Sequence, residues 1–120
     1  KYKWSGITNS VTGATGTAIG TGYSNTWAIF NQPDNELSAA VARTINYRGP
    51  NSLTDWFLPS SDELYNLWFF NYIFGGFPGD KYWSSTEVTS FSSYAYNFTF
   101  NYLFYTWKYD PFYIRPVRAF

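Results

Sequence analysis

Aromatic residues alternate with small or polar residues over positions 94–104. The aromatic positions are Tyr94, Tyr96, Phe98, Phe100, Tyr102 and Phe104, and those between them are Ala95, Asn97, Thr99, Asn101 and Leu103. A period of two places successive side chains on opposite faces of a strand. The pattern therefore predicts a strand over residues 94–104 with Phe100, and with it Tyr96 or Phe98, pointing inward. A second strand is expected over residues 113–119.

A helix is predicted over residues 37–47. Its apolar face repeats at the i, i+3, i+4, i+7 spacing of one buried helix face, which is made by Leu37, Ala40, Val41 and Thr44. Asp34 or Asn35 is expected to cap its start, and Gly49-Pro50 to end it.

A second helix is predicted to begin after Ser60 in the segment LPSSDEL. Ser60 and Glu63 stand at the spacing of a capping box, in which each side chain bonds the other residue's backbone N–H. Leu64, Leu67 and Trp68 then form its inward stripe. The glycines of FGGFPGD at 74–80 are expected to break this helix.

The first 35 residues are rich in Gly, Thr, Ser and Asn, which predicts turns and packed loops, with at most a short strand over residues 1–7. The glycines at 13, 16, 20 and 22 lack the Lys-Ser/Thr ending of a phosphate-binding loop. Two helices followed by strands predict an α+β domain with a small, mostly antiparallel sheet. At 120 residues the chain fits a single domain over 1–120.

The amino-acid composition excludes several kinds of partner and site. Eight basic residues balance eight acidic ones, and this flat balance argues against a nucleic-acid partner. The absence of Cys and His excludes disulfides, thiolate catalysis and zinc sites with nitrogen or sulfur ligands. No apolar run is long enough for a membrane span, and no signal peptide opens the sequence. A start at Lys1 is expected of an excised or processed domain, the C-terminal part of a longer protein.

Aromatic residues gather in the last part of the sequence. Only nine of the 30 Phe, Trp and Tyr residues lie in the first 67 positions, and 21 lie in the last 53. A domain of this size cannot bury so many rings from one segment, since each carries roughly 150–250 Å² of surface. We therefore expect a substantial exposed aromatic patch, and such patches mark interaction sites. Ser, Asn and Thr between the rings supply adaptable hydrogen bonds, as in antibody loops.

Several motifs resemble those of a known group of proteins: TGTAIGTGYSNT, DWFLPSSDEL, GGF, YWSSTE and the terminal RPVRAF. Their order and spacing are similar to those of C-type-lectin-like domains of the type related to the formylglycine-generating enzyme. Within that type, the chain most resembles the variable proteins of diversity-generating retroelements. The resemblance implies a compact scaffold whose C-terminal strands and loops display a hypervariable ligand-binding face. A reverse transcriptase diversifies that face by mutating template adenines.

Randomised Asn codons exclude Trp, Lys, Glu, Gln and Met, and 21 of the 23 residues at 91–113 belong to the permitted set. The exceptions are Trp107 and Lys108. Relatives tend to keep a fixed lysine where Lys108 stands, and a mutated Lys codon can yield Trp107. Relatives also often have a glycine after Phe100, which is missing from this sequence.

The resemblance implies which positions belong to the scaffold and which belong to the ligand-binding face. The scaffold positions it implies are Trp83, Ser84, Ser85, Thr86, Ala95, Phe100, Arg115, Pro116, Val117 and Arg118. The ligand-binding positions it implies are Phe91, Ser93, Tyr94, Asn97, Thr99, Asn101, Tyr102, Phe104, Tyr105, Trp107, Tyr109, Asp110, Phe112 and Tyr113. Four residues of the second predicted helix lie off its inward stripe and are expected on the same face, namely Phe69, Phe70, Asn71 and Tyr72.

Catalysis is not expected, and neither a cofactor nor a metal is predicted. The formylglycine-generating enzyme uses catalytic cysteines, which this chain lacks, and no Glu-Pro-Asn-like segment suggests a sugar-binding calcium site. Asp62 and Glu63 are explained by a helix start, where acids are favoured. Arg115 and Arg118 are expected to pair with buried acids such as Asp55 or Glu63.

The function expected is therefore ligand or receptor binding by a diversified face. The domain would belong to a phage tail adhesin or a bacterial surface protein, outside the cell. Its partner would be a protein or glycan on another cell surface, with no nucleic acid and no direct membrane insertion, and homo-oligomerisation stays open. Two alternatives remain: a lectin-like adhesion module of fixed specificity, and a degenerate, non-catalytic relative of the enzyme.

Overall fold

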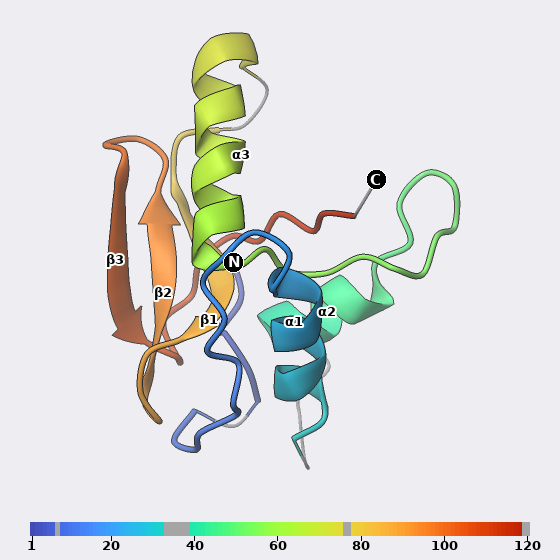
Figure 1. The fold of residues 1–120 in the computed structure, drawn as a ribbon, viewed down its shortest axis with the longest axis vertical. Coiled ribbons are helices and arrows are strands. Elements are labelled where there is room, and N and C mark those ends of the chain that lie inside the picture. The colour runs from blue at the N-terminus through green and yellow to red at the C-terminus, as the bar shows by residue number, and fades with distance from the viewer. Residues whose placement is uncertain (7, 33–38, 76–77, 119–120) are drawn as a thin grey trace.

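A computed structural model describes residues 1–6, 8–32, 39–75 and 78–118. Three helices precede three strands in the described chain: α1 (Gly22–Phe30), α2 (Ala40–Asn46), α3 (Ser61–Phe74), β1 (Lys81–Glu87), β2 (Ser92–Asn97) and β3 (Tyr102–Trp107). The strands form one antiparallel sheet in the order β1-β2-β3. In Figure 1 the sheet stands beside α3 with β3 outermost, and α1 and α2 lie on the other side of α3. The predicted α+β class with an antiparallel sheet is confirmed.

Helix α1 was not predicted, and the expectation of loops throughout the first 35 residues is wrong for this segment. The reason is that two of its buried residues are polar. The Asn25 side chain exchanges hydrogen bonds with the backbone of Gly16, and Thr26 Oγ1 accepts from Leu58 N at 2.9 Å. Since these polar groups face inward, the helix carries little apolar periodicity. The first residue of the helix is a glycine, and a Cβ at that position would lie 2.3 Å from Glu63 Oε1 and 2.9 Å from Leu58 O.

The two predicted helices are confirmed. Helix α2 buries Ala40, Val41 and Thr44 as expected, while Leu37 and the expected caps Asp34 and Asn35 lie outside the described residues. Helix α3 begins with the predicted capping box between Ser60 and Glu63. The described residues thus contain three helices where two were expected.

The predicted single strand over residues 94–104 is wrong, because the segment folds back on itself as a hairpin. Asn97 Oδ1 accepts a hydrogen bond from Phe100 N, and Asn101 adopts a positive φ of 57°. Asparagine forms such turns readily through its side-chain bond and its tolerance of the left-handed region. The rings continue to alternate with polar residues through the turn, so the sequence pattern gives no sign that the strand ends there.

Phe100 corrects a second expectation. It was predicted to point inward as part of the scaffold, but it lies at the tip of the turn and is 74 % exposed. Tyr96 and Phe98 are buried, as anticipated for one or the other of them.

The first residues stay within the expectation of at most a short strand, whereas the strand expected over residues 113–119 is wrong, because both segments make only single bridges. Tyr2 makes an isolated bridge to Phe112, and residue 7 lies outside the described residues. The tail after Tyr113 makes single bridges from Tyr113 to Tyr82 and from Val117 to Phe57, and residue 119 is not described.

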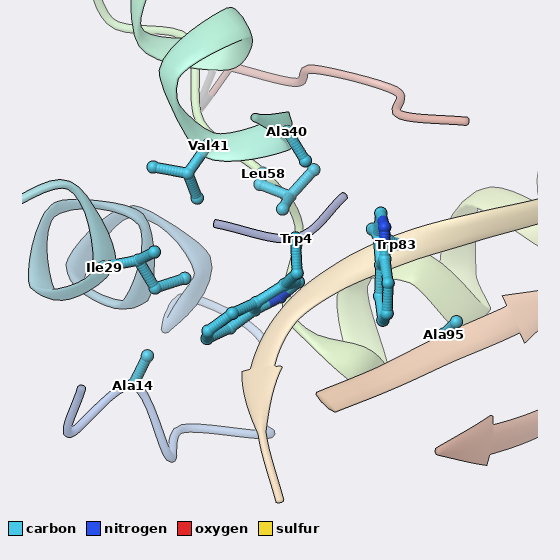
Figure 2. Packing of buried hydrophobic residues seen from close by; sticks show 8 residues of the cluster. All are labelled: Trp4, Ala14, Ile29, Ala40, Val41, Leu58, Trp83 and Ala95. Carbon is cyan, nitrogen blue, oxygen red and sulfur yellow. The ribbon is translucent and has the colours of Figure 1, made fainter. Parts of the chain in front are cut away.

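The core has two parts. The larger part contains Trp4, Ala14, Ile29, Ala40, Val41, Leu58, Trp83 and Ala95. Figure 2 shows Trp4 at its centre, with Ile29 of α1 on one side and Trp83 of β1 on the other. The smaller part lies between α3 and the sheet and contains Leu64, Tyr82, Tyr96 and Phe98, with Leu67 and Trp68 packed against it. The predicted inward stripe of α3 therefore packs on the sheet.

Candidate functional site

The aromatic residues of the hairpin divide between the two faces of the sheet. In the β2–β3 register, Tyr94 lies opposite Tyr105 and Ala95 lies opposite Phe104. Because side chains alternate along a strand, Leu103, Tyr105 and Trp107 share one face of β3, while Tyr102, Phe104 and Thr106 share the other. The predicted binding residues thus lie on two faces of one hairpin.

On the first face, five rings form what we call the Trp107 cluster: Phe91, Tyr94, Tyr105, Trp107 and Tyr109. The ring planes of Trp107 and Tyr109 are 5° from parallel with centroids 6.1 Å apart. Phe91 meets Trp107 edge-on, and Tyr94 meets Tyr105 edge-on, at 6.3 and 6.4 Å. Tyr105 is 65 % exposed and Trp107 is 53 % exposed. The cluster therefore offers ring faces to solvent as well as ring edges.

A shallow hollow of about 370 Å³ lies within this cluster. Its lining combines three of the rings with three hydroxyl residues: Thr89, Phe91, Ser92, Tyr105, Thr106 and Trp107. The Thr89 and Ser92 hydroxyls bond each other at 2.7 Å, and Thr106 Oγ1 donates to Asp110. None of the six lining residues is charged. Apolar contact with the rings, beside the Thr89 and Ser92 hydroxyls, is therefore the chemistry that this hollow offers.

Part of the second face packs against the core. Phe104 and Phe112 are half-buried and pack against the larger core cluster. Phe112 lies 4.7 Å from the Trp83 ring, and Phe104 lies 5.7 Å from Phe112. Tyr102 and Tyr113 remain exposed. This face consequently joins the predicted binding positions to the scaffold.

Two predicted binding residues do not reach the surface. Ser93 is fully buried, and Asn97 is buried apart from a small fraction. Asn97 instead holds the turn through Phe100 N and donates to the Tyr102 hydroxyl at 3.3 Å. Direct contact with a ligand is closed to both in this conformation, whereas Thr99 and Asn101 at the turn are exposed.

The α3 residues divide between two flanks of the helix. Tyr72 stacks on Trp68 with centroids 5.6 Å apart, and Trp68 stacks on Tyr65. Tyr65 lines a hollow of about 360 Å³ that also includes Tyr102 and Leu103, so this flank continues into the hairpin. Two residues along a helix differ by about 200°, which turns Phe70 away from Tyr72. Phe69 is also exposed and stands three residues before Tyr72, which is about 300° around the helix and therefore close to the same side.

Sequence reasoning missed Phe100, Leu103 and Tyr65 as exposed members of this surface. Phe100 and Leu103 were overlooked because the alternation was interpreted as one continuous strand. Tyr65 could have been found from its spacing, since it stands seven residues before Tyr72 and thus on the same side of the helix.

A buried ion pair holds the base of the Trp107 cluster. Lys108 is 0 % exposed although it stands between the exposed Trp107 and Tyr109. Its Nζ lies 2.7 Å from Glu87 Oε2, donates to Ser10 O at 3.0 Å, and lies 4.7 Å from the Trp4 ring centre. Burial lowers the pKa of Lys108, while the hydrogen bond to Glu87 opposes that shift.

Glu87 is fully engaged as well. Both of its carboxylate oxygens accept from Thr12 N, at 3.1 and 2.9 Å, in addition to Lys108. The backbone of Lys108 is bonded on both sides, donating to Phe91 O and accepting from Trp4 N. Lys108 therefore fixes the chain where it leaves β3, and so fixes the position of the rings on either side of it.

Two further acids, Asp55 and Glu63, are engaged in structural contacts. Arg118 donates to both carboxylate oxygens of Asp55, as predicted for Arg118, although Asp55 is exposed rather than buried. The hydrogen bond from Arg118 lowers the pKa of Asp55. Glu63 accepts from Gly20 N, Gly22 N and Ser60 N. Across the described residues, no group of three or more His, Cys, Asp or Glu side chains could hold a metal ion.

A third hollow, of about 530 Å³, lies away from the hairpin between α1, α3 and the C-terminal tail. Its apolar lining includes Ile19, Tyr23, Phe57, Pro59, Leu67 and Val117, and the Asp55–Arg118 pair stands at its border. The sequence carried no signal for it, because the lining residues are scattered over four segments.

Within the parts of the chain that the structure describes, none of the helices has the length and apolar character needed to cross a membrane. In comparisons with known proteins, no family model matches the chain, and no curated protein or solved structure does so either.

Proposed function

We propose that this chain is a ligand-binding domain and that the Trp107 cluster, continued by the hairpin turn and by Tyr65 and Tyr72 of α3, is its binding surface. The domain binds without catalysing a reaction. Its fold is C-type-lectin-like, and it serves as the variable protein of a diversity-generating retroelement, on a phage tail or a bacterial surface. The resemblance of the motifs between residues 15 and 120 supports the fold and the diversification.

The observation that carries the proposal is the exposure of the rings in β3 and in the turns around it. Tyr105, Trp107 and Tyr109 lie in solvent, whereas Trp4 and Trp83 are fully buried in the core. Large aromatic side chains give much contact area for little loss of side-chain entropy, and binding hot spots are enriched in Trp and Tyr. Exposed rings cost solubility, so their concentration on one surface favours a binding role.

The scaffold supports such a role. Lys108 and its partners are buried, so the chain can change ring residues on either side without disturbing the ion pair. Two of the acids are held in ion pairs, Glu87 by Lys108 and Asp55 by Arg118. A fixed frame beneath an exchangeable surface is the arrangement that diversification requires.

The test is substitution of the exposed rings. Tyr105→Ala and Trp107→Ala are expected to weaken binding to the ligand found on an array of glycans and bacterial surface proteins by about 30-fold each, the size of a hot-spot loss. The melting temperature should change little. Tyr47→Ala is the matched control, because Tyr47 is an exposed tyrosine at the end of α2, outside the sheet. Unchanged binding, or a large loss of stability, would refute the proposal.

The diversification is tested in DNA. The expected finding is a near-identical template repeat, with adenines at the codons of the exposed ring positions, beside a reverse-transcriptase gene. If independent alleles carry the same residues throughout 91–113, the alternative of a lectin-like adhesion module with fixed specificity replaces it. A chain that binds nothing on either kind of array would favour a degenerate relative with a structural role.

A further inference from the structure

The outer edge of β3 is open. Lys108 N donates to Phe91 O, which continues the β2–β3 register by one pair beyond Ser92 and Trp107. In an antiparallel pair, hydrogen-bonded positions alternate along the strand. The backbone groups of Phe104 and Thr106 therefore point toward β2, whereas those of Leu103 and Tyr105 point away from it. No hydrogen bond within the described residues engages the outward groups of Leu103 and Tyr105.

The position of β3 in the sheet agrees with an outer edge that is open. In Figure 1, β3 is the outermost strand, and no described element lies beyond it. The strand is also nearly regular, pairing with β2 without a break at six successive positions. A strand of six residues offers an edge about 20 Å long.

The edge lacks the features that usually prevent pairing with another chain. Natural edge strands are protected by charged residues, proline, bulges or a covering segment. The sequence of β3 is Tyr-Leu-Phe-Tyr-Thr-Trp, without charge, proline or glycine, and every residue in it favours strands or tolerates them. An edge of this kind either aggregates or has a partner.

Resting on the proposed binding role of this surface, we infer that the ligand is an extended polypeptide segment of another protein, which adds to the sheet as a fourth strand along β3. Only a polypeptide backbone offers N–H and C=O groups at the spacing of Leu103 and Tyr105. A sugar can stack on Trp107 but cannot complete this edge.

The side chains around the edge define the character of that segment. Its alternate residues would meet Leu103, Tyr105 and Trp107 on one face and Tyr102 and Phe104 on the other. Aromatic rings pair well across strands with β-branched and aromatic residues. Since β3 presents no charge, the segment is expected to be uncharged and rich in Val, Ile, Thr or aromatic residues.

The experiment uses random 12-residue peptides displayed on phage and selected on the full chain. Bound peptides should slow hydrogen exchange at the Leu103 and Tyr105 amides by about tenfold or more, because both amides become bonded. The amides of Phe104 and Thr106, already bonded to β2, should change less. Peptides that bind without protecting Leu103 and Tyr105 would overturn the inference.

Two substitutions at one position separate the backbone from the side chain. Leu103→Pro removes the outward N–H and leaves the bonds to β2 intact, whereas Leu103→Ala removes the side chain and keeps the N–H. Leu103→Pro is expected to weaken peptide binding about tenfold more than Leu103→Ala, because it leaves a peptide carbonyl unpaired. Equal effects would contradict added-strand binding. The exchange measurement on the unsubstituted chain decides the matter even if the proline variant folds poorly.

The remaining outcomes distinguish this inference from the proposed function. If no peptide is selected while a glycan binds and requires Tyr105 and Trp107, the added strand is refuted and the binding surface stands. If selected peptides protect Leu103 but ignore Tyr105→Ala and Trp107→Ala, the edge is supported and the proposed ring surface fails. Concentration-dependent dimerisation that protects Leu103 would make a second copy the occupant and overturn the inference of a different partner.

Discussion

Along the outer edge of β1, four backbone hydrogen bonds tie the strand to distant parts of the chain. They run from Trp83 N to Tyr113 O, from Tyr113 N to Lys81 O, from Ser85 N to Pro59 O and from Glu87 N to Ala14 O. Along the outer edge of β3, the described chain supplies no such bonds to Leu103 and Tyr105. The same sheet therefore has one edge covered by its own chain and one edge left open.

Burial normally favours apolar residues inside and polar residues outside, and the two edge strands show the opposite. The last four residues of β1, Ser84 to Glu87, are polar or charged and buried, whereas Tyr105 and Trp107 of β3 are aromatic and exposed. Buried polar groups need partners, and those of β1 find many of them in the backbone of other segments. The comparison teaches that the edge of β1 contributes to the stability of the fold, whereas the edge of β3 is left open for the proposed binding role.

The largest expected effect on stability is at Lys108, where the chain passes from the open edge of β3 to the interior. Lys108→Ala leaves the Glu87 carboxylate buried without its cation and should destabilise the fold by about 3–5 kcal/mol. Chemical denaturation measures this loss. The double variant Glu87→Ala with Lys108→Ala should lose less than the sum of the two single changes, and additive losses would show that the pair is not coupled.

Proline at matched positions of the two edges gives the next largest effect. Ser85→Pro removes the bond to Pro59 O on the covered edge and should cost about 3 kcal/mol. Leu103→Pro on the open edge removes an N–H without a partner in the described chain and should cost less than about 1 kcal/mol. Similar losses of stability at the two positions would break the comparison.

A smaller effect is expected at Tyr96, beneath the hairpin. Its hydroxyl donates to Asn101, so Tyr96→Phe should cost about 1 kcal/mol. Burial raises the pKa of Tyr96 above the usual 10.0. Above pH 10 the unfolded chain therefore loses a proton that the folded chain still holds, and stability falls as pH rises. Tyr96→Phe should lessen this alkaline loss in urea titrations at pH 9 to 11, and an unchanged slope would contradict the assigned burial.

The smallest effect is expected at Phe100. Because its ring lies in solvent at the turn, Phe100→Ala should change stability by less than about 0.5 kcal/mol. Thermal unfolding measures it, with Phe98→Ala as the control because the Phe98 ring is buried and should cost about 3 kcal/mol or more. A large loss at Phe100 would restore the inward position predicted from the sequence.

What the sequence could predict depended on local signals. The capping box at Ser60 and the apolar repeat of α2 are local, and both helices followed from them. Helix α1 did not, because Asn25 and Thr26 are buried by bonds to Gly16 and Leu58, which lie elsewhere in the chain. No local pattern records such partners.

The proposed binding surface was predicted only in part for the same reason. Ring density predicted an exposed patch, since a small core cannot hold so many rings, and the resemblance placed Tyr105 and Trp107 on it. The turn at 98–101 was hidden because Asn97 and Asn101 keep the alternation going while the backbone reverses. Without the turn, neither the open edge of β3 nor the burial of Ser93 could be foreseen.

The most direct test of the contrast between the edges is amide hydrogen exchange on the free chain. Leu103 and Tyr105 should exchange rapidly, while Trp83 and Ser85, bonded outward to Tyr113 and Pro59, should be protected by about a hundredfold or more. If Leu103 and Tyr105 are protected as strongly as Trp83 and Ser85, the edge of β3 is covered in solution and the division between a stabilising edge and a binding edge is wrong.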